Sequence, residues 1–85
     1  MNVEVEGIGD DDFLVKVEAS TEHRVTLTDA YWEQVWNSSL PKKEIISRSF
    51  AFILEREPNS SIMRTFDLPV IQRYFSEYEG IAATW

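Results

Sequence analysis

The chain has 85 residues, of which 44% are hydrophobic and 27% charged, so it suits one small folded domain and is too hydrophobic for a disordered segment. Its formal net charge of −7 argues against a nucleic-acid partner, because affinity for nucleic acid comes mainly from Lys and Arg that displace counterions. With no cysteine, disulfides, thiolate nucleophiles and cysteine-ligated zinc are excluded. We expect a single domain over residues 1–85.

The first third of the chain, residues 2–28, alternates between apolar and polar side chains, as half-buried strands do. The alternating segments lie at about 2–8, 13–19 and 23–28, and short polar connections separate them. Because short connections join neighbouring antiparallel strands, the pattern predicts a three-stranded antiparallel β-meander.

A helical period follows, over residues 29–76. Thr28 or Asp29 is a suitable N-cap for a short helix that ends near Asn37. One long central helix is predicted from Pro41 to Glu57, and short helical turns are expected in the apolar clusters at residues 62–66 and 69–75. Residues 77–85 have no period and are expected to form a loose tail. The predicted fold class is therefore α+β, with the meander packed against the long helix and shorter helices.

The helix predicted from Pro41 to Glu57 is apolar over an arc of roughly 200°, whereas a surface helix has a stripe of about 100° or somewhat more. Six residues form this arc: Ile45, Ile46, Phe50, Phe52, Ile53 and Leu54. Such a helix must be covered from two directions, one by the sheet and the other by the last third of the chain or by a second subunit. Ser49 lies within the arc, where its hydroxyl can bond the Ile45 carbonyl and its small size favours the close approach of a second helix.

The short helix predicted after Thr28 carries Tyr31, Trp32 and Trp36. Such aromatic residues either fill the core beneath the sheet or anchor a protein partner, since Trp and Tyr dominate interface energetics. The candidate interaction surface consists of these three residues together with Phe52 and Arg48 on the predicted long helix. No catalytic, cofactor-binding or metal-ligating residue is predicted.

His23 is the one imidazole of the chain. A nucleophilic pair would join it to Ser38, Ser47 or Ser49, but the sequence has neither a nucleophile elbow nor a glycine-rich oxyanion loop. The interpretation we favour places His23 at the exposed end of a strand.

The acidic run at residues 10–12 raises the question of calcium. Calcium loops space their acids at alternate positions and end in a bidentate Glu, whereas these three Asp residues are consecutive and Thr21 occupies the twelfth place. A solvated hairpin turn is the better interpretation, so we expect no metal and no cofactor.

Charge is unevenly divided along the chain. Residues 1–34 carry the entire net charge of −7, and residues 35–85 are neutral. The four arginines of the second part alternate with acids, which favours intramolecular ion pairs over phosphate contacts; they are Arg48, Arg56, Arg64 and Arg73.

Much of the chain from His23 to Glu79 resembles a family of small uncharacterised bacterial proteins. The phrase RSFAFILEREP at residues 48–58, the block FDLPVI at 66–71 and the segment YFSEYE at 74–79 carry the resemblance. The family brings no established activity, so the resemblance implies a stand-alone bacterial module and assigns no functional residue.

The expected function is that of a small acidic protein-interaction module or companion subunit without catalytic activity, with another protein or a second copy as its partner. The N-terminal segment is acidic and alternating, unlike a secretory signal, and no run approaches the roughly 18 apolar residues of a membrane span, so we expect a cytoplasmic protein with no membrane contact. The alternative is a nucleic-acid-associated regulator, as an antitoxin-like partner of a basic protein. A small enzyme that uses His23 is the third hypothesis.

Overall fold

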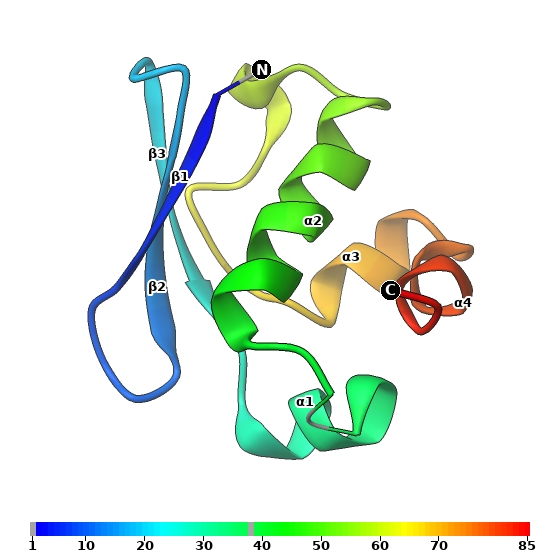
Figure 1. Cartoon of the computed structure of the whole chain (residues 1–85). Coiled ribbons are helices and arrows are strands. Elements are labelled where there is room, and N and C mark those ends of the chain that lie inside the picture. Colours follow the sequence, from blue (N-terminus) through cyan, green and yellow to red (C-terminus); the bar gives the residue numbers. More distant parts are fainter. Residues whose placement is uncertain (1, 38) are drawn as a thin grey trace.

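The computed structural model describes residues 2–37 and 39–85. It is an α+β structure in which a four-stranded sheet lies on one side and the helices lie on the other (Figure 1). The elements are β1 (Val3–Gly7), β2 (Asp12–Val17), β3 (Thr21–Thr26), α1 (Asp29–Trp36), α2 (Lys42–Leu54), the 3-10 helix η1 (Asn59–Ser61), β4 (Thr65–Asp67), α3 (Val70–Tyr74) and α4 (Tyr78–Ala82). Within the described residues, no helix is long and apolar enough to cross a membrane.

The antiparallel meander predicted from the alternation is confirmed. β2 lies between β1 and β3, with Val15 opposite Val5 on one side and opposite His23 on the other. The connection predicted at residues 20–22 is displaced, because the chain turns at Glu18 and Ala19, whose φ angles are 54° and 55°, and β3 already begins at Thr21.

The sheet has a fourth strand that the sequence did not predict. β4 pairs in parallel with β3, and its ends are fixed by backbone bonds from Arg24 N–H to the Arg64 carbonyl (2.6 Å) and from Leu68 N–H to the Thr26 carbonyl (2.9 Å). The helical turns predicted over residues 62–66 are therefore wrong. A strand of three residues is too short to display its own period, and its pairing with β3 decides its conformation.

α1 and α2 begin close to where the sequence predicts. The Thr28 side chain accepts a hydrogen bond from Tyr31 N–H at 3.3 Å at the start of α1. α2 follows directly on Pro41 and ends at Leu54, three residues before the predicted end at Glu57.

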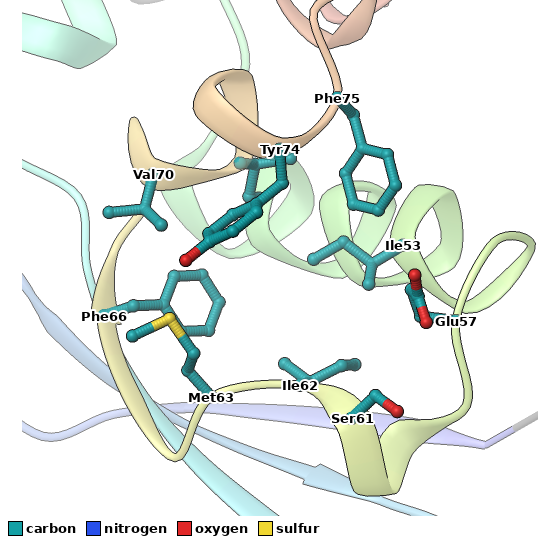
Figure 2. A pocket seen from close by; sticks show the side chains of 10 residues that line it. Ile53, Glu57, Ser61, Ile62, Met63, Phe66, Val70, Tyr74 and Phe75 are labelled. Atoms are coloured by element: carbon teal, nitrogen blue, oxygen red, sulfur yellow. The ribbon is translucent and has the colours of Figure 1, made fainter.

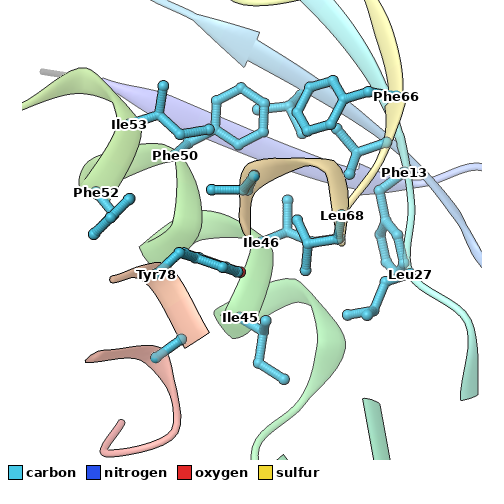
Figure 3. Close-up of a cluster of buried hydrophobic side chains, with 14 of the residues drawn as sticks. Phe13, Leu27, Ile45, Ile46, Phe50, Phe52, Ile53, Phe66, Leu68 and Tyr78 are labelled. Atoms are coloured by element: carbon cyan, nitrogen blue, oxygen red, sulfur yellow. The ribbon is translucent and has the colours of Figure 1, made fainter. Parts of the chain in front are cut away.

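The broad apolar surface of α2 is covered mostly within one chain, and Leu54 at its end stays only partly buried. The sheet covers one side of the helix, and α3 and α4 pack on the other side (Figure 1). Figure 3 shows the resulting core, in which side chains of the sheet and of α2 meet those that follow β4. Five of the six residues in the predicted arc are buried: Ile45, Ile46, Phe50, Phe52 and Ile53. The sequence left open whether the second side of this helix is covered by the last third of the chain or by a second subunit. In the structure it is covered by the last third of the chain.

The prediction of a loose tail at residues 77–85 is wrong. This segment contains α4, in which Tyr78 and Ala82 are fully buried. Tyr78 reaches the small Ser49 on α2, and their hydroxyl oxygens are 2.6 Å apart. Ser49 also donates to the Ile45 carbonyl at 2.7 Å, so Tyr78 is the donor in the first bond and the close approach expected at Ser49 is confirmed.

Candidate functional site

Two of the three aromatic residues predicted as an interaction surface lie in the core. Trp36 is 3% exposed, and its indole N–H donates to the Ala82 carbonyl at 2.9 Å, while its ring stacks with Trp85 at 6.4 Å. Tyr31 is also buried, and its hydroxyl donates to Glu79 Oε2 at 2.9 Å. These contacts fasten α4 to α1, so both residues stabilise the fold.

Trp32 lies at the boundary between core and solvent. It is half-buried, and its indole N–H donates to the Leu40 carbonyl at 2.7 Å. The Lys42 ammonium lies 5.4 Å from the centre of the Trp32 ring and bonds Asp29 at 2.7 Å and Asp11 at 3.0 Å. Burial lowers the pKa of Lys42, but the bonds to the two carboxylates outweigh it and hold the pKa above its usual value. Trp32 and Lys42 therefore join the start of α2 to α1 and to the turn before β2.

The two candidates on α2 differ in their exposure to solvent. Phe52 is buried, with its ring 5.3 Å from that of Tyr78 and the Arg56 guanidinium 3.6 Å from its centre. Arg48 is exposed and pairs with Glu44 at 3.0 Å, as their spacing along the helix predicts. The five candidate residues do not form one exposed surface.

His23 is buried within the sheet and not at an exposed strand end. It is 1% exposed, and its Nδ1 lies 2.9 Å from the Met63 carbonyl oxygen, which only accepts hydrogen bonds. Nδ1 therefore carries the proton, and Nε2 accepts from the Thr21 hydroxyl at 2.9 Å. Both nitrogens are engaged in structural bonds, and the Nδ1 bond to Met63 holds the segment before β4 against β3.

The two described serines among the candidate partners of His23, Ser47 and Ser49, do not complete a nucleophilic pair with it. Ser49 bonds Ile45 and Tyr78, and the hydrogen bonds of the His23 ring go to Met63 and Thr21. Ser38 lies outside the described residues.

The acidic turn before β2 makes ion pairs with basic side chains. Asp11 bonds Lys42, and Asp12 lies 3.8 Å from Arg24 and accepts from the Thr26 hydroxyl at 2.7 Å. Within residues 2–37 and 39–85, no group of three or more His, Asp or Glu side chains is placed to hold a metal ion.

An open apolar hollow lies between β4, the end of α2 and α3, and we call it the β4 groove. Its volume is about 430 Å³. It is lined mainly by Ile53, Ile62, Met63, Phe66, Tyr74 and Phe75, with Glu57 at its border.

The rim of the β4 groove exposes large apolar side chains. Tyr74 is 70% exposed and Met63 is 49% exposed, whereas Phe66 between them is nearly buried. Figure 2 shows Met63, Phe66 and Tyr74 gathered at one side of the groove and Phe75 and Glu57 at the other. Contiguous exposed apolar side chains are typical of surfaces that contact other proteins.

The strand that borders the groove is an edge of the sheet. The strand order is β1-β2-β3-β4, so β4 has a neighbour on one side only. Since the Arg64 carbonyl and the Leu68 N–H point toward β3, the alternation of backbone groups along a strand directs those of Thr65 and Asp67 away from it. Both residues are exposed. The groove thus adjoins a row of backbone donors and acceptors open to another chain.

The sequence did not indicate this groove. Its residues come from the end of α2, from η1 and β4 and from α3, and each segment is too short to show which of its apolar side chains face solvent. The chain matches no protein-family model, and comparisons with curated proteins and with solved structures give no match either.

Proposed function

We propose that the protein is a small acidic interaction module without catalytic activity, and that the β4 groove is the surface with which it contacts a protein chain. The observation that carries the proposal is the exposure of Tyr74 and Met63 at the rim of an apolar hollow beside an open strand edge. The resemblance of residues 48–58, 66–71 and 74–79 to small bacterial proteins supports a bacterial module.

The residues that support this proposal are not those that the sequence suggested. The predicted surface around Trp36 and Phe52 is engaged in holding the helices together, and α2 is covered by α3 and α4. At the β4 groove, in contrast, apolar side chains and strand backbone face outward together. Side-chain pockets beside an open strand are the features by which sheets bind extended chains.

The chemistry of the groove suits a protein ligand more than a charged small molecule. Its lining is mostly aliphatic and aromatic, and Glu57 is the charged member. A groove of this kind gains affinity by removing apolar surface from water, at about 25 cal/mol per Å². The ligand surface should therefore be apolar where it meets Met63 and Tyr74.

Photo-crosslinking in the native cells tests the proposal. Benzoylphenylalanine replaces Tyr74 in one variant, and in the control it replaces Gln34, which is exposed on α1 and is not part of the groove. We expect a defined protein adduct from position 74 and none from position 34.

A second substitution shows whether the groove itself makes the contact. Met63→Glu places a carboxylate at the rim. Because Met63 is 49% exposed, the carboxylate can remain in water and the fold should be retained. The adduct from position 74 should disappear in this variant. An adduct of equal yield from both positions, or no adduct at all, contradicts the proposed function.

A further inference from the structure

The open edge of β4 has a pattern that is complementary to itself. The backbone groups of Thr65 and Asp67 point outward, and those of Phe66 between them point toward β3. In an antiparallel pair, two opposed residues that both point at the partner strand exchange both backbone hydrogen bonds. Two β4 strands related by a two-fold axis at Phe66 satisfy this condition at each Thr65 and each Asp67.

We propose that the occupant of the β4 groove is a second copy of this chain, joined by antiparallel pairing of the two β4 strands into one continuous eight-stranded sheet. The inference rests on the proposed function and names its partner. In this register Thr65 lies opposite the partner's Asp67, and Asp67 lies opposite the partner's Thr65.

The side chains brought together by this register fit each other. A threonine hydroxyl opposite a carboxylate is a hydrogen-bonded pair that the sheet already contains, since Thr26 lies opposite Asp12 and donates to it at 2.7 Å. The two-fold register centred on the next outward-pointing residue fits less well. A register centred on Asp67 opposes two carboxylates and brings Thr65 against Pro69, which has no N–H to donate.

The distribution of charge favours the β4 edge over the β1 edge. Residues 1–34 carry the net charge of −7 and form β1 to β3, whereas residues 35–85 are neutral and include β4 and α3. Pairing at β4 brings the neutral parts together and leaves β1, with its exposed Glu4 and Glu6, at the outer ends of the joined sheet. Pairing at β1 would bring these acids together.

The same pairing covers the exposed rim of the groove. Phe66 points to the helix side of the sheet, where it lines the groove with Met63 and Tyr74 (Figure 2). In the two-fold arrangement both Phe66 side chains lie at the axis on that side, so the two grooves face each other. The exposed Met63 and Tyr74 of each copy then become available to cover the groove of the other.

Sedimentation equilibrium between about 1 µM and 1 mM tests the inference with Thr65→Pro. Proline removes the Thr65 N–H, which is not used within one chain, and proline is tolerated where the N–H of an edge strand faces solvent. The parent chain should be a dimer in this range. The variant should keep the circular dichroism spectrum of the parent chain, and its dimer Kd should be at least tenfold higher.

Two charge substitutions at the same exposed position provide a test that does not depend on proline. Thr65→Asp opposes the partner's Asp67 and should raise the dimer Kd about fivefold to tenfold, whereas Thr65→Lys should lower it or leave it unchanged. Gln34→Asp and Gln34→Lys make the same changes in net charge away from β4. The dimer Kd values of these two control variants should equal each other.

The outcomes separate this inference from the proposed function. A chain that stays monomeric to 1 mM, or a dimer that is indifferent to Thr65→Pro and to the sign of the charge at position 65, overturns the inference. If position 74 still forms an adduct with a different protein, the proposed function stands and the second copy is the wrong partner. An adduct between two copies, lost with Thr65→Pro, supports both.

Discussion

Two apolar regions of this molecule each contain aromatic side chains, but one is covered by a later segment of the chain and the other is open to solvent. The first, which we call the α4 cluster, consists of Trp36, Tyr78 and Trp85 and is closed by α4. The second is the β4 groove, where Tyr74 and Met63 remain exposed. Each contains a tyrosine of the last third of the chain, four residues from the other. The difference teaches that aromatic content marks apolar regions, and that only packing by a later segment decides which of them becomes core.

The comparison of the two tyrosines gives the largest expected effect. Tyr78→Ala should lower the free energy of unfolding by about 3–5 kcal/mol, because it removes a fully buried ring between Phe52 and Trp85. Tyr74→Ala should change it by less than about 0.5 kcal/mol, because Tyr74 is 70% exposed. Urea unfolding followed by circular dichroism measures both. Equal losses would mean that the groove belongs to the core.

Alkaline pH should destabilise the packing of α4, through Tyr78 of the α4 cluster and through Tyr31, which bonds Glu79. Burial raises the pKa of Tyr78, with a smaller contribution from nearby Glu79, and burial followed by the bond to Glu79 raises that of Tyr31. Both phenols are neutral in the folded and unfolded chain below pH 10, so stability is independent of them there. Above pH 10 the unfolded chain loses protons that the folded chain retains, and stability falls as pH rises.

The measurement is an alkaline titration with absorbance at 295 nm for tyrosinate and circular dichroism for structure. The tyrosinate signal of Tyr31 and Tyr78 should appear together with unfolding. Above pH 10, the free energy of unfolding of Tyr78→Phe should fall less steeply with pH than that of the parent chain, because one phenol fewer ionises on unfolding. An unchanged slope in this variant would exclude Tyr78 as a cause.

A medium effect on the free energy of unfolding is expected at His23, which bonds the Met63 carbonyl beside the groove. His23→Phe keeps a ring beside Phe50 but removes the bond to the Met63 carbonyl, and should cost about 1–3 kcal/mol. Hydrogen exchange can localise the change. The Arg24 amide, bonded to the Arg64 carbonyl, should exchange faster, whereas the Ile81 amide of α4 should not change beyond the global effect. Uniform acceleration would show that the two regions open as one unit.

The smallest effect is expected at the exposed ion pair of α2, which belongs to neither region. Arg48→Ala should cost about 0.3–0.5 kcal/mol, because an exposed pair one turn apart on a helix contributes little. Thermal unfolding in low and high salt measures it, and the difference between Arg48→Ala and the parent chain should shrink as salt rises. A loss above about 1 kcal/mol would indicate a further contact of Arg48.

The strand alternation and the width of the apolar arc were predicted correctly from the sequence, whereas the helix that carries the arc ends three residues before the predicted end. The alternation over residues 2–28 produced the meander, and the capping residue Thr28 marked the start of α1. The width of the apolar arc on α2 correctly required two covers. Ser49, as a small residue inside that arc, correctly marked the approach of another helix.

The short segments after α2 were not predicted correctly. β4 has three residues and α4 has five, so neither repeats a pattern often enough to be recognised. The burial of Trp36 was not predicted for the same reason. Trp36 was a candidate for exposure because nothing in residues 77–85 indicated that Ala82 and Trp85 would cover it.

The sequence by itself determined the fold class, the antiparallel meander, the start of α1 and the need to cover α2 from two sides, because periodicity and capping are local properties. The tertiary structure decided the rest: that β4 joins the sheet edge, that α4 closes over Trp36, and that Met63 and Tyr74 stay outside. The physical reason is that burial depends on which distant segments meet. In a chain of 85 residues, one short helix is enough to convert an exposed aromatic side chain into core, and the absence of another above β4 leaves the groove open.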